Sequence, residues 1–422
     1  MKNNLETMSR IALFRDRETE PGDPATGGGV SVDLDLGSGI KSALAVEHDG
    51  DTIHGAELPT RLYAAERKAA GALAQKRAKP DLLAFVLAYF FGECQSTAAG
   101  AGYRHEISPT AGLELPTFTA IQRRGATVFT ERLSGNYLEG FSLELGEGWV
   151  SLSAEVLGTG GREVSYAHET VTAPANTLTL TLADGVTGAS AAERRANVYR
   201  VRARDVGSEV WTVAAVTAVS GAAPAVITLA EAVGSTAGEI DFEVDYLPTA
   251  QPWCALPAAV DESPLRLVDA RVVVDGWFDG EELVGGEELQ AELLGFTVAG
   301  KNNLELRRFP GDPGPAALAL RGGRELTVTL TESLRDTVLL YQADHPETET
   351  LALALRIQGA PIAGAGGLCF GAELIFPRCG ILAAPVTTSG KRLAQAGDLV
   401  VLDDGTYGGA VVRCFNLQTG YL

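Results

Sequence analysis

The sequence predicts a mainly β protein: an antiparallel β-sandwich or barrel core with one or two flanking helices, plus an inserted small β-sandwich domain. Three observations predict this class. Apolar and polar residues alternate in many short segments separated by Gly, Asp and Pro, which is typical of half-buried strands. Residues 82–91 are apolar on nearly every side, as expected of a buried helix. Between 166 and 253 the strands are short and the turn signals regular, which is typical of a small sandwich.

The predicted organisation is a core that is split by an insertion. The first part of the core covers residues 1–165, the inserted Ig-like sandwich covers 166–253, and the second part of the core covers 254–422. A proline-rich stretch, "QPWCALPAAVDESP", marks the exit from the insertion. At 422 residues the chain can bury a sizeable core, and its 45% hydrophobic content is ordinary for a globular protein.

The first segments are a loop and a strand. Residues 14–29, "FRDRETEPGDPATGGG", show no periodicity and predict a long mobile arm or loop. The arm is punctuated by Pro21, Pro24, Gly27, Gly28 and Gly29. Residues 30–37 alternate as a strand with serine and aspartate on the exposed side.

Two helices are predicted next, within residues 60–91. Residues 60–78 are rich in Ala, Leu, Arg, Lys and Glu, which favour helix, and Pro80 ends that segment. Asp81 can then cap the apolar helix 82–91, and Gly92 is placed to stop it.

The stretch 138–158, "LEGFSLELGEGWVSLSAEVLG", predicts two strands around the turn Gly146–Gly148. Phe141, Leu143 and Leu145 alternate with polar residues before the turn, and aliphatic residues from Val150 onward do so after it. The predicted exposed face comprises Ser142, Glu144, Ser151, Ser153 and Glu155. This face contains serines and carboxylates and no lysine or arginine.

The same type of pattern returns after the insertion. A strand-turn-strand unit is predicted at 288–309, and its Gly-Phe-Thr segment shares a spacing with the Gly-Phe-Ser segment of 138–158, a hint of two related halves. Further strands complete an antiparallel series at 324–342, 350–357, 370–382 and 409–417.

Charge and cysteine usage exclude several classes of protein. With 34 Lys and Arg against 54 Asp and Glu, the net charge of −20 argues against a conventional nucleic-acid binder and against docking on anionic membranes. Solubility is the alternative reason for such acidity. The first twenty residues contain no apolar signal-peptide core, the longest apolar run is too short to cross a membrane, and the five cysteines are scattered. We expect a cytoplasmic product with reduced thiols.

No sequence motif predicts enzymatic chemistry, a cofactor or a metal. Residues 39–42, Gly-Ile-Lys-Ser, resemble a phosphate loop, but Ile40 separates the glycine from the lysine. The segment 46–54, "VEHDGDTIH", could bind a metal through His48, Asp49, Asp51 and His54, although a polar loop between strands explains it more simply. No nucleophile elbow occurs, so we expect a protein that is not an enzyme.

Two blocks of the chain resemble the tail tube protein of long-tailed bacteriophages (the major tail protein family). Residues 103–158 look like that family's run of a strand, a second strand beginning "P-T-F-T" and a hairpin headed by glycine. Residues 324–385 are similar to its later run of a polar-faced strand, a short helix and a strand ending "F-P-R". The insertion 166–253 goes beyond the plain tube fold, although the family commonly carries Ig-like additions.

The resemblance implies a virion protein that is assembled in the bacterial host cytoplasm. Such proteins form rings, typically of six subunits, that stack into a tube through which genomic DNA passes without specific binding. The exposed face of 138–158 would then line the lumen and repel phosphate. The arm 14–29 and the loop around 276–288 would make ring-to-ring contacts, and the partners would be further copies of the chain and the tape measure, tail terminator and tail-tip or baseplate proteins.

Two other functions remain open at this point. Another virion component, such as a head decoration protein or a tail-end adaptor, would fit the same composition. A cell-surface or scaffold β protein whose sandwich binds glycan or protein is the other alternative, and it would need an export signal.

Overall fold

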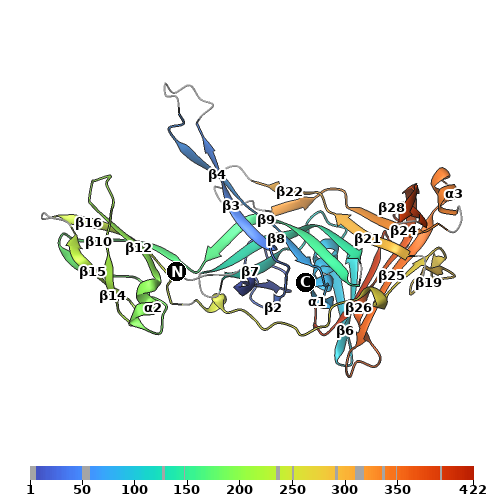
Figure 1. The fold of residues 1–422 in the computed structure, drawn as a ribbon, viewed down its shortest axis with the longest axis horizontal. Coiled ribbons are helices and arrows are strands. Elements are labelled where there is room, and N and C mark those ends of the chain that lie inside the picture. The colour runs from blue at the N-terminus through green and yellow to red at the C-terminus, as the bar shows by residue number, and fades with distance from the viewer. Residues whose placement is uncertain are drawn as a thin grey trace. The chain divides into compact units, whose positions relative to one another are not determined.

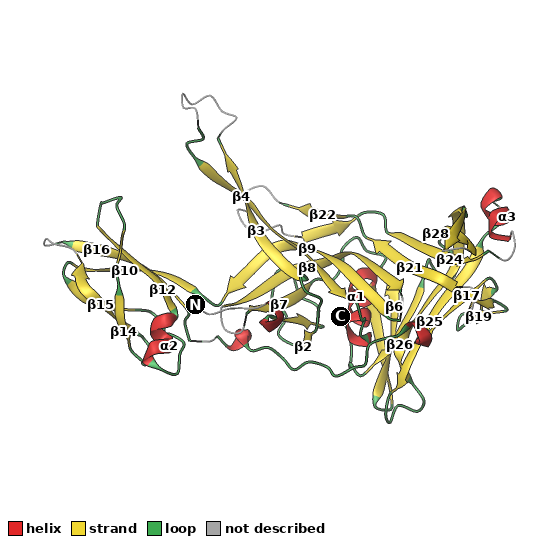
Figure 2. Ribbon diagram, in the orientation of Figure 1, coloured by secondary structure: helices red, strands yellow, loops and turns green. Residues whose placement is uncertain are grey.

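The computed structural model describes residues 6–49, 58–125, 129–146, 148–233, 238–249, 251–289, 293–308, 318–334, 338–347, 349–389 and 392–422 (Figure 1). The protein is mainly β with antiparallel strand pairs and few helices (Figure 2), which confirms the predicted fold class. The chain divides into two compact units. The sandwich unit comprises residues 1–10, 121–132 and 163–256, and the core unit comprises 11–120, 133–162 and 257–422.

The core unit contains two sheets that share a strand. In the first sheet, hydrogen-bonded neighbours follow one another in the order β3 (Gly39–His48), β4 (Leu62–Gln75), β9 (Val150–Val164), β8 (Phe129–Leu145), β21 (Leu293–Lys301), β24 (Glu325–Ser333) and β28 (Arg392–Val401).

Strand β28 also pairs with β26 of the second sheet, so this strand belongs to both sheets and joins them. The order in the second sheet is β5 (Gly92–Ala99), β6 (Gly102–Pro109), β29 (Val411–Asn416), β26 (Cys369–Ala383), β25 (Leu351–Pro361), β17 (Ala270–Val274) and β20 (Glu287–Leu289).

Helix α1 (Pro80–Phe91) lies inside the core unit, and all of its residues are buried. Phe90 packs edge to face on Phe141 of the first sheet, with the ring centroids 4.8 Å apart, and the helix also contacts β29 and β6 of the second sheet. A helix that is apolar on every side must be surrounded by other parts of the protein, as α1 is here. Gly92 ends the helix in a left-handed conformation with φ 97°, as predicted.

Two predictions about the helices are wrong. The N-cap of α1 is Lys79 rather than Asp81, because the helix already begins at Pro80, whose fixed φ suits the first helical position. The predicted helix 60–78 is the strand β4, which pairs with β3 on one edge and with β9 on the other. Helix propensity is a local preference of well under 1 kcal/mol per residue, and pairing on both edges outweighs it.

The small residues that suggested a helix in this segment have a different role. A Cβ on Gly71 would lie 2.2 Å from the carbonyl oxygen of Gly39, so only glycine permits the two strands to approach there. Ala69 and Leu73 point into the core and are fully buried.

The N-terminal part of the core unit is a loop, as predicted, but it is not a free arm. Strand β1 (Arg10–Phe14) pairs with β2 (Gly29–Val32), and the predicted strand 30–37 ends at Val32. Between them, Glu18 is only 5% exposed and accepts hydrogen bonds from the hydroxyl of Thr119 at 2.7 Å and from the amide of Gly135 at 2.9 Å. These bonds fix the loop to the core.

The sandwich unit contains two small sheets around a separate core. One sheet consists of β10 (Ala167–Pro174), β16 (Glu239–Tyr246), β12 (Val198–Asp205) and β13 (Thr212–Val213). The other consists of β11 (Thr177–Thr181), β15 (Val226–Val233) and β14 (Val216–Val219). Side chains such as Phe242, Val201 and Ile227 fill the space between the sheets. Helix α2 (Ala191–Ala196) begins with a capping box of Ser190 and Glu193.

Shorter elements complete the fold: β7 (Phe118–Arg124), β18 (Trp277–Phe278), β19 (Leu283–Val284), β22 (Leu304–Arg307), β23 (Leu318–Arg321), α3 (Val338–Asp344) and β27 (Val386–Ser389).

Candidate functional site

The five residues predicted for the exposed face of 138–158 all lie on the side of the first sheet that faces away from the core. Glu144, Ser153 and Glu155 are exposed, and Ser142 and Ser151 are half-buried. The alternating partners, Phe141, Leu143, Leu145, Val150, Leu152, Ala154 and Val156, are all buried. Alternation along each strand therefore separates a polar side from an apolar side cleanly.

Strand pairing extends this polar side across three more strands. Glu144 lies opposite Thr297 of β21, which lies opposite Thr329 of β24, which in turn lies opposite Asp398 of β28. We call the combined surface the polar face. It comprises Ser142, Glu144, Ser151, Ser153, Glu155, Thr297, Ala299, Lys301, Glu325, Thr327, Thr329, Thr331 and Asp398.

The polar face is acidic but contains one cation. Its charged groups are the carboxylates of Glu144, Glu155, Glu325 and Asp398 and the ammonium group of Lys301. The hairpin taken alone has no lysine or arginine, so the neighbouring strand β21 modifies that prediction. Carboxylates remain in excess, and an excess of one sign on a wall repels ligands of the same sign.

Two shallow hollows lie along the polar face. The first, of about 330 Å³, is lined by Ser142, Ser153, Glu155, Lys301 and Glu325 among others. The second, of about 420 Å³, is lined by Glu144, Thr297, Thr329 and Thr331 together with backbone and aliphatic groups. Serine or threonine hydroxyls line both hollows, together with three charged side chains in the first and mainly apolar side chains in the second. These hydroxyls are weak hydrogen-bonding groups that water can satisfy.

Sequence reasoning missed the contribution of β21, β24 and β28 to this face. The signal was present in "LTVTLTES", where Thr327, Thr329 and Thr331 alternate with aliphatic residues. The alternation does not show which strands lie next to one another, because the pairing and register of strands far apart in sequence are set by tertiary packing. The Gly-Phe-Ser and Gly-Phe-Thr segments, which looked like repeats, lie on neighbouring antiparallel strands, and Gly300 faces Phe141 across the ladder.

The residues predicted for ring contacts lie elsewhere on the core unit. Pro21 and Gly28 are exposed, and Pro24, Gly27 and Gly29 are half-buried. The predicted contact loop 276–288 contains the small hairpin β18–β19, which packs against the second sheet through the buried side chains of Phe278 and Leu283. Trp277 on the same hairpin is 61% exposed.

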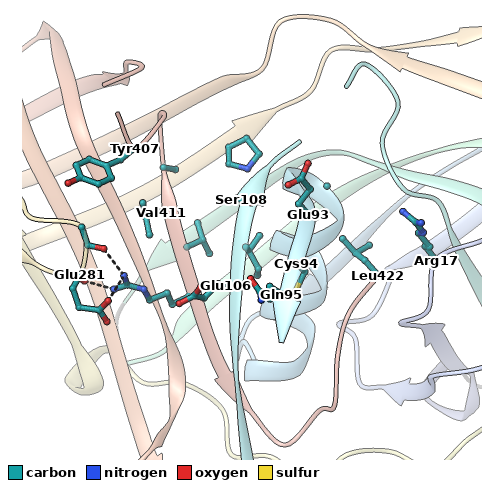
Figure 3. A pocket seen from close by; sticks show the side chains of 17 residues that line it. Arg17, Glu93, Cys94, Gln95, Glu106, Ser108, Glu281, Tyr407, Val411 and Leu422 are labelled. Atoms are coloured by element: carbon teal, nitrogen blue, oxygen red, sulfur yellow. Dashed lines mark hydrogen bonds and ion pairs between the residues drawn. The ribbon is translucent and has the colours of Figure 1, made fainter. Parts of the chain in front are cut away.

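A hollow of about 790 Å³ lies over the second sheet of the core unit, where residues of β5, β6 and β29 line it (Figure 3). Its lining includes the polar side chains of Glu93, Gln95, Glu106, Glu281 and Arg413. Arg413 donates a hydrogen bond to the carboxylate of Glu373 at 3.0 Å and forms a longer ion pair with Glu281 at 3.6 Å. The guanidinium of Arg413 is therefore paired with carboxylates of the chain itself.

Cys94 is disfavoured as a nucleophile at this hollow. Cys94 lines it, but burial raises the pKa of the Cys94 thiol, which disfavours the thiolate that a nucleophile requires. All five cysteines are free thiols. Within the described part of the chain, no group of three or more His, Cys, Asp or Glu side chains is placed to hold a metal ion.

The structure describes some of the residues that the sequence suggested for a metal site or a phosphate loop. Asp49 accepts hydrogen bonds from the hydroxyl of Thr60 at 2.6 Å and from its backbone amide at 2.8 Å, whereas Asp51 and His54 lie outside the described residues. Residues 39–42 belong to the extended strand β3, which differs from the loop and helix that cradle a phosphate.

Comparison with known proteins adds no family assignment. No protein-family model matches the chain, and no curated protein sequence matches it. Among the described residues, no helix is both long enough and apolar enough to span a membrane.

Proposed function

We propose that this protein is a structural subunit that assembles into stacked rings, typically of six copies, and forms the tail tube of a long-tailed bacteriophage. In this proposal the polar face lines the lumen and genomic DNA slides past it without specific binding. The observation that carries the proposal is the continuity of the polar face over β9, β8, β21, β24 and β28.

The composition of the polar face supports a role in passage rather than in binding. Proteins that hold DNA neutralise phosphates with lysine and arginine and release counterions. Over β9, β8, β21, β24 and β28 the polar face has four carboxylates and one ammonium group, that of Lys301, which is the opposite balance. Lys68 of β4 and Lys41 of β3 lie on the same side of the sheet beyond this face. Repetition of the face around a ring and along a stack would multiply a small repulsion per subunit into a continuous negative wall.

The hairpin β3–β4 supports self-assembly. Its outer half is exposed, and Leu44, Val46, Leu62 and Tyr63 are between 43% and 75% exposed. A two-stranded ribbon is marginally stable alone in water, and clustered exposed apolar residues indicate a protein contact. A second copy of the chain is the partner that the proposal supplies for it.

The proposal also gives a role to the loop 15–28 and to the exposed Trp277, which would contact the next ring. The tape measure, tail terminator and tail-tip or baseplate proteins would be the further partners of the completed tube.

Negative-stain electron microscopy of the purified chain tests the proposal directly. We expect rings or short tubes at high protein concentration, with sedimentation showing species much larger than a monomer. A sample that remains monomeric at high concentration across a range of salt would contradict it. Rings that cap or adapt another assembly but never stack would instead favour the tail-end adaptor.

A further inference from the structure

A buried cluster of carboxyl and phenol groups joins helix α1 to the loop 257–265 and to the segment 416–422. Asp81 in the first turn of α1 is 6% exposed, Glu262 of the loop is 4% exposed and Tyr421 of the segment is 3% exposed. We call these three residues the carboxyl cluster. All of them belong to the core unit.

Hydrogen bonds within the carboxyl cluster hold the segment in place. The hydroxyl of Tyr421 donates to Asp81 Oδ1 at 2.6 Å, and Asn416 Nδ2 donates to that hydroxyl at 2.8 Å. Glu262 Oε2 accepts a hydrogen bond from the backbone amide of Asp81 at 2.8 Å. Asp81 therefore holds the segment through Tyr421, and Glu262 binds the backbone of the same aspartate.

The other carboxyl oxygen of Glu262, Oε1, accepts no hydrogen bond from the described residues. This oxygen is also buried. A buried ionised oxygen without a partner costs far more free energy than a neutral hydroxyl in the same place. The buried position of Oε1 therefore favours the protonated form of the Glu262 carboxyl group.

The nearby cations are engaged with other groups. Lys79 Nζ binds Asp33 at 2.7 Å, and the guanidinium of Arg15 donates to the side chain of Gln418. Burial lowers the pKa of His105, whose Nε2 lies 2.9 Å from Asn416 Oδ1 of the segment. Among the described residues, no cation forms an ion pair with either carboxyl group of the cluster, and the attraction of Arg15 and Lys79 for Asp81 acts only at longer range.

Two buried carboxyl groups this close cannot both ionise without cost. Burial raises the pKa of Asp81. Burial, followed by the charge of Asp81, raises the pKa of Glu262 to about 7. We propose that Glu262 carries a proton while the carboxyl cluster is closed, and that its ionisation releases the segment 416–422. The cluster is then a pH-sensitive latch, and this role does not depend on ring assembly.

The direction of the pH dependence follows from proton linkage. A group whose pKa is raised in the closed state stabilises that state fully below its unperturbed pKa, which is 4.5 for Glu262. That contribution is lost progressively as the pH rises through about 7. The latch is therefore closed in mild acid and weakened in mild base.

Hydrogen–deuterium exchange of the full chain tests the latch. After correction for the intrinsic pH dependence of exchange, opening of the segment 416–422 should increase about tenfold between pH 6 and pH 8. The variant Glu262→Gln carries a neutral side chain of the same shape and should abolish this increase. Glu93→Gln removes an exposed carboxylate and should leave the increase unchanged.

Equal pH dependence in the wild type and in Glu262→Gln would overturn the proposal. Infrared spectroscopy of the wild type covers the case in which the variant does not fold. A protonated carboxyl band should be present at pH 6 and should disappear by pH 8. A spectrum with no titrating carboxyl group in that interval would also overturn it.

Discussion

Phe90 of helix α1 and Phe141 of strand β8 pack edge to face inside the core unit, with ring centroids 4.8 Å apart and ring planes 79° apart. Phe141 immediately precedes Ser142, which lies on the polar face. The contact therefore couples the buried helix to the strand that presents the polar face. A Cβ on Gly300 would lie 2.6 Å from each of the two rings, so the neighbouring strand has no room for a side chain where both rings pack.

Removing this contact should destabilise the core unit. We expect Phe141→Ala to lower the free energy of unfolding by about 3–5 kcal/mol, since it removes a large buried side chain and leaves a cavity. Ser142→Ala, one residue away on the opposite side of the strand, should change it by less than about 0.5 kcal/mol. Denaturant titration compares the two, and equal effects would mean that the assignment of sides is incorrect.

Reversing charge on the polar face should affect DNA passage but not assembly. Glu144→Lys combined with Glu155→Lys replaces two exposed carboxylates by groups that contact phosphate, so tubes should form while DNA delivery slows. The matched control, Glu144→Gln with Glu155→Gln, removes the same negative charges without adding cations. We expect the lysine variant to slow delivery more than the glutamine variant, as measured by DNA-release kinetics. Normal delivery by the lysine variant would place this face outside the lumen.

Deleting residues 166–253 should leave the core unit folded. The residues of its hydrophobic core all lie outside this range, and the sandwich has a separate core of its own. Both ends of the deleted segment lie near Arg132, which pairs with Glu163 and stacks on Trp253 at 5.1 Å, so a short linker can join them. Circular dichroism and electron microscopy should show retained strands and retained assembly. An unfolded product would mean that the core depends on the sandwich.

Loosening the loop 15–28 should expose it to protease. We expect Glu18→Gln to weaken the charge-assisted hydrogen bonds to Thr119 and Gly135 by about 1.5–3 kcal/mol in total. Trypsin cleavage after the exposed Arg17 should then accelerate at least tenfold, because cleavage follows local opening. Glu20→Gln, at an exposed position of the same loop, is the control and should cleave at the wild-type rate.

The sequence determined the features that depend on local pattern. Strict alternation in 138–158 assigned Ser142 and Glu144 to one side of a strand and Phe141 and Leu143 to the other, since successive side chains in a strand point to opposite faces. An apolar run followed by Gly92 gave a buried helix with a left-handed end, because only glycine takes that conformation at little cost.

Tertiary structure alone decided the features that depend on distant pairing. Residues 62–75 form a strand despite their helix-favouring composition, because β3 and β9 supply hydrogen bonds on both edges. The row from Glu144 through Thr297 and Thr329 to Asp398 depends on the registers of three strand pairs, and a shift of one residue in any of them would turn its side chains to the other face. Asp81 and Glu262 are 181 residues apart, so their contact and its effect on proton binding could not be predicted from local pattern.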